Sequence, residues 1–147
     1  MKPTRIPLLV ALAAVAGGVA YIVTRAHYSD FPSPQPYWPV TVLLIAIIES
    51  VTARTTRARL AGRPRTRPIE PIAVARTAAL AKATSPVGAL FAGGYAGFLI
   101  HVSRIAGHQA TTDTRTAVFG IVASLALVAA ALLLEHVCRV PKPRDRD

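Results

Sequence analysis

The 147-residue chain has few of the charged groups that a soluble domain of its size displays. Charged residues make up 16% of the sequence, against about 25% in ordinary soluble domains. Acidic residues are the scarcest, since Asp and Glu number 7 whereas Lys and Arg number 17. The single cysteine, Cys138, excludes an internal disulfide and a thiolate-clustered zinc or iron–sulfur site. Together with a mean hydropathy of +0.43, these shortages indicate a membrane protein rather than a soluble domain.

Long apolar runs are abundant instead, in four blocks at residues 6–23, 40–53, 83–102 and 117–134. A helix needs roughly 20 apolar residues to cross about 30 Å of hydrocarbon. The second block is shorter, but its helix can continue through Thr55 and Thr56 while the arginines beyond reach the headgroups. We therefore predict an all-α integral membrane four-helix bundle. It forms a single transmembrane domain over residues 1–140, with spans at about 6–25, 39–57, 71–103 and 115–138 and a tail at 141–147; the third span includes a cytoplasmic extension.

Lys and Arg are distributed unevenly between the two sides of these spans. They precede the first span, fill the loop between the second and third, and follow the fourth, whereas only Arg25, Arg104 and Arg115 fall on the other side. Because cytoplasmic loops carry the excess of cations, both termini and the central loop are predicted to be cytoplasmic, in the cytoplasmic membrane. The first block is longer than the usual signal-peptide core of about 7–15 residues, which favours a retained helix over a cleaved signal.

The loop between the second and third spans is rich in arginine. On the cytoplasmic side this loop lies next to an anionic lipid leaflet. We therefore expect its arginines to fix the orientation of the protein in the membrane and to contact anionic lipid headgroups. A dock for a specific lipid or protein is the weaker alternative, and nucleic-acid binding is disfavoured because the loop has no aromatic residue for stacking. The expected lipid contacts are Arg54, Arg57, Arg59, Arg63, Arg65 and Arg67.

Small residues recur every four positions along the third span, at Ser85, Ala89, Gly93 and Gly97. Such a face lets another helix backbone approach closely in lipid. We expect it to pack against spans of the same chain, or else against a second copy or a membrane-protein partner. Plausible mates within the chain are Ala13–Gly17 and Ala14–Gly18 on the first span, or Gly120–Ser124 on the fourth. Pro86, within the third span, predicts a kink.

Glu49 is the one acidic residue well inside a predicted span. An ionised carboxylate there is costly, so we expect it to be paired or protonated. Lys82 is the first candidate partner and Arg76 the second; a Glu49 that reaches the inner surface near Arg54 or Arg57 is the equal alternative.

Catalytic and metal-binding patterns are missing from the polar residues. His101, His108 and Asp113 fall on the outer side, but their spacing matches no ligand pattern, so no metal and no cofactor is predicted. The sequence therefore favours a non-enzymatic protein that acts as a scaffold or accessory subunit through helix association. The alternative is a small oligomeric transporter or channel that uses Glu49 with Lys82.

Several segments resemble a family of small actinobacterial membrane proteins catalogued as domain of unknown function 3180. The resemblance rests on the initial MKPTR, on TRPIEP, on ARTAALAKATSPVGALFAGGYAG and on the terminal LLLEHVCRVP, and it covers nearly the whole chain. It implies a four-span inner-membrane protein with no assigned activity, and it assigns no catalytic or binding residue.

Overall fold

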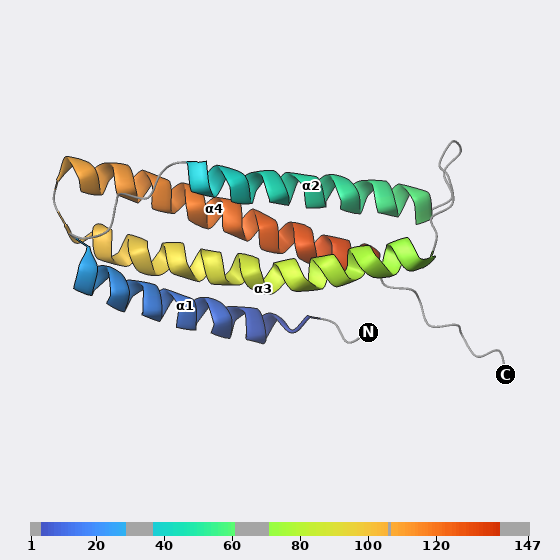
Figure 1. The fold of residues 1–147 in the computed structure, drawn as a ribbon, viewed down its shortest axis with the longest axis horizontal. Helices are drawn as coiled ribbons and strands as arrows, with labels where there is room; N and C mark the ends of the chain where they lie inside the picture. The colour runs from blue at the N-terminus through green and yellow to red at the C-terminus, as the bar shows by residue number, and fades with distance from the viewer. Residues whose placement is uncertain (1–3, 29–36, 61–70, 106, 139–147) are drawn as a thin grey trace.

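Four long helices make up almost the whole of the described chain (Figure 1). The computed structural model describes residues 4–28, 37–60, 71–105 and 107–138. The helices are α1 (Ile6–His27), α2 (Tyr37–Leu60), α3 (Pro71–Val102) and α4 (His108–Val137), and these described residues contain no β-strand. Each helix is long and apolar enough to cross a membrane, which confirms the predicted all-α bundle.

The helix bounds follow the hydropathy of the sequence with two additions. Helix α3 has 32 residues, which gives a length of about 48 Å at 1.5 Å per residue and leaves part of it beyond a hydrocarbon layer of about 30 Å. Helix α4 begins at His108, earlier than the predicted 115, because Gly107 adopts a φ of 154° that turns the chain directly into the helix. The polar residues after His108 therefore form the first turns of α4 instead of a loop.

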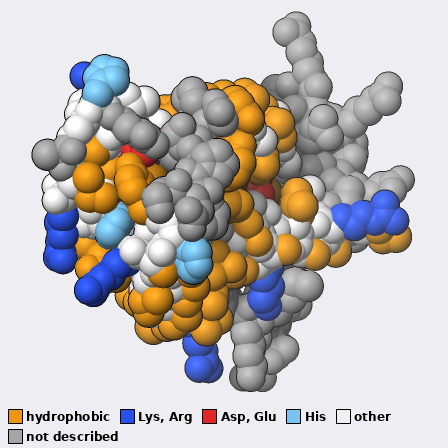
Figure 2. Space-filling view, turned by 60° about the vertical axis from the view of Figure 1, so that its left-hand side comes forward, with side chains coloured by type: hydrophobic (Ala, Val, Ile, Leu, Met, Phe, Trp, Pro, Cys, Tyr) orange, Lys and Arg blue, Asp and Glu red, His pale blue; other side chains and the backbone are white. Residues whose placement is uncertain are grey.

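The helices form an open row in which α3 and α4 are the central pair (Figure 1). Helix α1 packs along α3, and α2 packs along α4. On the face shown in Figure 2, hydrophobic side chains cover much of the described surface, and Lys, Arg and His side chains lie around them. Such an apolar exterior is expected where lipid replaces water as the solvent.

Helix α2 contacts the central pair through one seam. Its buried positions recur at intervals of three and four residues, as in helices that cross at a shallow angle. Val42 and Ala46 pack with Ala123 and Leu127 of α4. Towards the other end, a second cluster joins three helices and contains Ala53 of α2, Ala81 of α3, and Leu134 and Cys138 of α4.

Helix α1 meets α3 at very short range through glycine. A Cβ added at Gly93 would fall on the backbone carbonyl of Ala13, and one added at Gly97 would fall on that of Gly17. The two backbones are thus in direct contact, which is the packing mode that drives helix association in lipid. Only Leu9 of α1 is buried, so this glycine contact is the main attachment of the helix along its length.

Candidate functional site: a buried carboxyl group between three helices

Glu49 lies in the buried seam of α2, twelve positions after the start of the helix. At 1.5 Å per residue this places it roughly 18 Å along the helix axis, well inside the candidate span Tyr37–Ala58. The side chain is only 3% exposed. The Glu49 carboxyl group is therefore buried inside the helix row, where an ionised carboxylate without a counter-charge is strongly disfavoured.

The register of the neighbouring helices identifies what surrounds this carboxyl group. Ala53, one turn after Glu49, lies in the same buried cluster as Ala81 of α3, together with Leu134 and Cys138 of α4. Because α3 runs in the opposite direction, the next layer pairs Glu49 with the turn of α3 that contains Thr84 and Ser85. In agreement with this register, the side chain of Thr84 lies within hydrogen-bonding reach of that of Glu49.

Among the described residues, three buried side-chain atoms have no hydrogen-bond partner; two of them lie in this layer, and the third is Asp113 Oδ1. Glu49 Oε2 and Ser85 Oγ are buried and have no hydrogen-bond partner among the described residues. Ser85 differs in this from its neighbours, since Thr84 donates to the Leu80 carbonyl at 2.9 Å and Ser124 donates to the Gly120 carbonyl at 2.7 Å. Buried polar groups without partners are uncommon in folded proteins and often mark functional positions.

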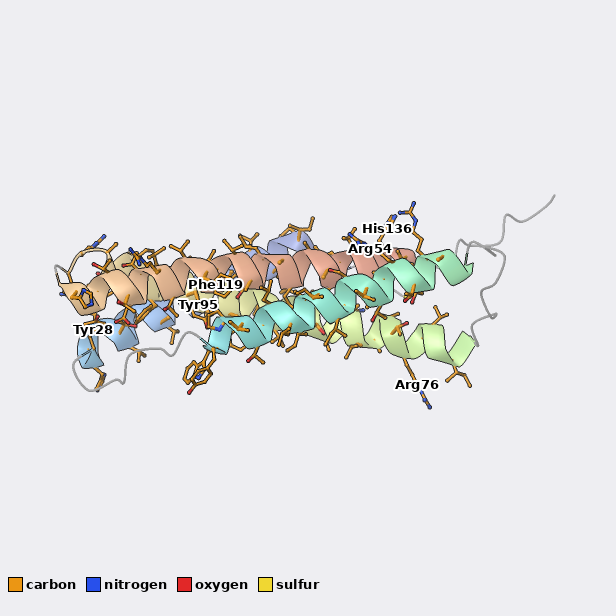
Figure 3. All side chains as sticks on the ribbon, turned by 90° about the horizontal axis from the view of Figure 1, so that it is seen from above. Tyr28, Arg54, Arg76, Tyr95, Phe119 and His136 are labelled. Carbon is orange, nitrogen blue, oxygen red and sulfur yellow. The ribbon has the colours of Figure 1, made fainter. Side chains whose placement is uncertain are left out.

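The cations that the sequence offered to Glu49 lie on the exterior of the helices. Lys82 and Arg76 have exposed side chains on α3, and Arg54 and Arg57 have exposed side chains on α2. Figure 3 shows Arg76 pointing away from the bundle near the end where Arg54 and His136 also lie. Glu49 lies beside Thr84, a neighbour that was not predicted from the sequence because Thr84 carries no charge. The Glu49–Lys82 pair stays a prediction.

The predicted lipid-binding arginines fall mostly near or beyond the end of α2. Arg54 and Arg57 lie on its last turns, and Arg59 lies within the helix. Arg63, Arg65 and Arg67 are outside the described residues. Contact with anionic headgroups therefore stays a prediction for the whole group.

The predicted packing face of α3 divides between two neighbours. Ser85 and Ala89 are buried, at 0% and 4% exposure, on the part of α3 that packs in the central pair. Gly93 and Gly97 meet Ala13 and Gly17 of α1. This part of the small-residue face is therefore occupied within the chain.

A second polar cluster lies at the opposite end of the bundle from Arg54, where Figure 3 labels Tyr28. The Tyr28 hydroxyl donates to Asp113 Oδ2 at 2.9 Å, and Asp113 is 1% exposed. The ring of His101 makes edge contacts with those of Tyr21 and Tyr28. Burial raises the pKa of Tyr28, and the hydrogen bond to Asp113 and its negative charge raise it further. This bond was not predicted from the sequence, although Asp113 occupies the same buried seam of α4 as Ala110 and Ala117.

This cluster does not bring His101, His108 and Asp113 into one constellation. In the part of the chain that the structure describes, no three His, Cys, Asp or Glu side chains gather in a way that could hold a metal ion. Its geometry instead links α1 to α4 across the end of α3.

A shallow groove runs between α1 and α3 on the outside of the row. Small residues line it, among them Ala14 and Gly18 of α1 and Ala96 of α3, and Tyr21 and Arg104 line one end. A Cβ added at Gly18 would meet nothing within 4 Å. No contact within the described part of the chain therefore requires a glycine at position 18 of this candidate span.

Comparison with known proteins identifies one family. The model of the family described as "Protein of unknown function (DUF3180)" matches residues 9–142. No curated protein and no solved structure matches the chain. The chain belongs to this family of unknown function.

Proposed function

We propose that this multi-pass membrane protein is a non-enzymatic accessory or scaffold subunit that binds another membrane protein through its helices. The observation that carries the proposal is the groove between α1 and α3, which keeps Ala14 and Gly18 uncovered. Small side chains on a lipid-facing surface permit the close backbone approach on which helix association in membranes depends. Gly93 and Gly97 already serve that purpose for α1, so the uncovered pair is the better candidate for a second chain.

The open row supports the same role. Helices α1 and α2 each pack along one neighbour, so both broad faces of the row remain available to a partner. In an apolar stretch of each candidate span, between 6% and 44% of the residues are buried. A partner that lay along one face would cover apolar surface without any change in the row. We place the protein in the cytoplasmic membrane, with both termini and the arginine-rich loop in the cytoplasm.

Cysteine crosslinking in native membranes tests the proposal. Cys138 is first replaced by alanine, and Gly18→Cys is compared with Val19→Cys, which lies at the same depth but is 55% exposed on a side away from the groove. A short thiol–amine or photoactivated crosslinker should join Gly18→Cys, and not Val19→Cys, to a second polypeptide. Equal capture at both positions, or capture at neither, would contradict a partner in the groove.

A second candidate function is supported by the buried Glu49 carboxyl group. An intramembrane acid is typical of ion and proton pathways, and an oligomer of this chain with Glu49 and Lys82 is the form that the sequence suggested. Flux through reconstituted liposomes, compared between the wild type and Glu49→Gln, tests this transporter or channel function. Identical flux at every pH would remove the carboxyl group from it.

A further inference from the structure

Glu49 and Ser85 present two buried oxygen atoms in the same layer of the bundle. Glu49 is 3% exposed and Ser85 is fully buried. Neither Glu49 Oε2 nor Ser85 Oγ has a hydrogen-bond partner among the described residues. Ala53 and Ala81, one turn away on each helix, belong to one buried cluster with Leu134 and Cys138 of α4, which places the two residues at a similar level. Their unused oxygens thus belong to one place in the fold, where α2, α3 and α4 meet.

The third member of the layer, Thr84, adds another oxygen of the same chemical kind. Its hydroxyl group donates its single hydrogen to the Leu80 carbonyl at 2.9 Å, and it lies within hydrogen-bonding reach of the Glu49 side chain. Because a hydroxyl group carries one hydrogen and two lone pairs, Thr84 retains acceptor capacity beside the carboxyl group. Carboxylate and hydroxyl oxygens are the hard ligands that alkali and alkaline-earth cations select.

The charge of the layer limits the ion to a single positive charge. Glu49 supplies one negative charge, and the packed stretch 116–134 of α4 contains no ionisable side chain. The other charged groups near this level are cations, Arg54 on α2 and Lys82 on α3, and both are exposed. A monovalent cation would neutralise the layer, whereas a divalent one would leave an uncompensated positive charge away from water.

We propose that Glu49, Ser85 and Thr84 form a binding site for one monovalent cation within the membrane-spanning bundle. Glu49 Oε2 and Ser85 Oγ are its principal ligands, and the lone pairs of the Thr84 hydroxyl oxygen beside them supply a further ligand. The same oxygens accept a proton when the cation is absent, so the cation and the proton compete. This site does not depend on a protein partner in the α1–α3 groove, and it requires binding rather than transport.

Modification by a hydrophobic carbodiimide tests the site in the purified full-length protein, because the reagent reacts with a protonated carboxyl group in an apolar environment. Labelling of the peptide containing Glu49 is followed by mass spectrometry in Na⁺ and in choline at equal ionic strength. Na⁺ should slow the labelling by the factor 1 + [Na⁺]/Kd, which is roughly tenfold when Na⁺ is about ten times Kd. The protection should strengthen as pH rises, because fewer protons compete for the carboxylate.

Two serine variants form a matched pair. Ser85→Ala should keep the labelling and lose the Na⁺ protection, whereas Ser124→Ala should keep both, because the hydroxyl of the equally buried Ser124 is already bonded to Gly120. Glu49→Gln should abolish the labelled peptide. Thermal unfolding in detergent provides the second measurement: Na⁺ should raise the Tm of the wild type and of Ser124→Ala but not that of Glu49→Gln. The proposed site would be overturned if Na⁺ did not change the rate of labelling. It would also be overturned if Glu49 were not labelled at all and Na⁺ did not change the Tm of the wild type.

Discussion

Thr4 holds both carboxylate oxygens of Glu135, although 131 positions separate the two residues. The Thr4 N–H donates to Oε1 at 2.9 Å and its hydroxyl donates to Oε2 at 2.5 Å. At the other end of α1, Tyr28 donates to Asp113. Helix α1 packs along α3, yet both of its ends are bonded to carboxylates of α4. The two bonds fix the tilt and the register of a helix that has little buried surface of its own.

The bond at Glu135 should contribute measurably to stability. Glu135→Ala removes the acceptor for two donors of Thr4, so we expect a loss of about 1–3 kcal/mol in the free energy of unfolding. Unfolding in mixed detergent micelles measures this loss. His136→Ala, an exposed neighbour on the same turn, is the control and should change stability by less than about 0.5 kcal/mol. An equal effect of the two substitutions would show that Thr4 does not depend on the carboxylate.

At the other end of α1, Tyr28→Phe should leave the buried Asp113 without its hydroxyl donor. We expect a loss of about 1–3 kcal/mol at neutral pH. Tyr21→Phe is the control, since the Tyr21 hydroxyl makes only a 3.4 Å contact with the exposed Arg104 guanidinium. A similar cost for both changes would mean that the general loss of a tyrosine hydroxyl, and not the Asp113 bond, is responsible.

Alkaline pH should weaken the protein through the same residue. Burial and then Asp113 raise the pKa of Tyr28 above its ordinary value of 10.0. The folded state therefore keeps a proton that the unfolded state loses, so this contribution to stability is complete below about pH 10 and declines above it. The free energy of unfolding measured from pH 8 to pH 11 should fall less steeply in Tyr28→Phe than in the wild type. Parallel profiles would contradict the assignment.

The helices could be predicted from sequence because a bilayer imposes their length and polarity on each segment separately. No comparable local rule gives the order of the row, in which α1 and α2 lie on opposite sides of the α3–α4 pair. The contacts of Thr4 with Glu135 and of Tyr28 with Asp113 depend on that order, so they could not be predicted from the sequence. Glu49 was recognised from the cost of burying its charge, but its neighbour Thr84 carries no charge to signal it.

The orientation of the row remains a prediction that impermeant thiol reagents can test. In a Cys138→Ala background, Gly62→Cys lies in the arginine-rich loop and Ser103→Cys follows α3 at an exposed position. The side of the membrane protein that carries most Lys and Arg residues is expected to stay in the cytoplasm, and Gly62 lies on that side. Ser103→Cys should therefore react in intact cells, and Gly62→Cys only after the membrane is permeabilised. The reverse pattern would invert the topology and place the termini outside.

Neighbouring glycines of α3 offer the sharpest test of the packing. Gly93→Ala would set a methyl group onto the Ala13 carbonyl, so α1 must move away and we expect a loss of about 1–3 kcal/mol. Gly94→Ala meets nothing within 4 Å and should be neutral, or more stable by up to about 1 kcal/mol from helix propensity. Unfolding in mixed micelles compares two chemically identical changes at adjacent positions in one helix. If Gly94→Ala were instead the more damaging change, α1 would have to lie on a different face of α3.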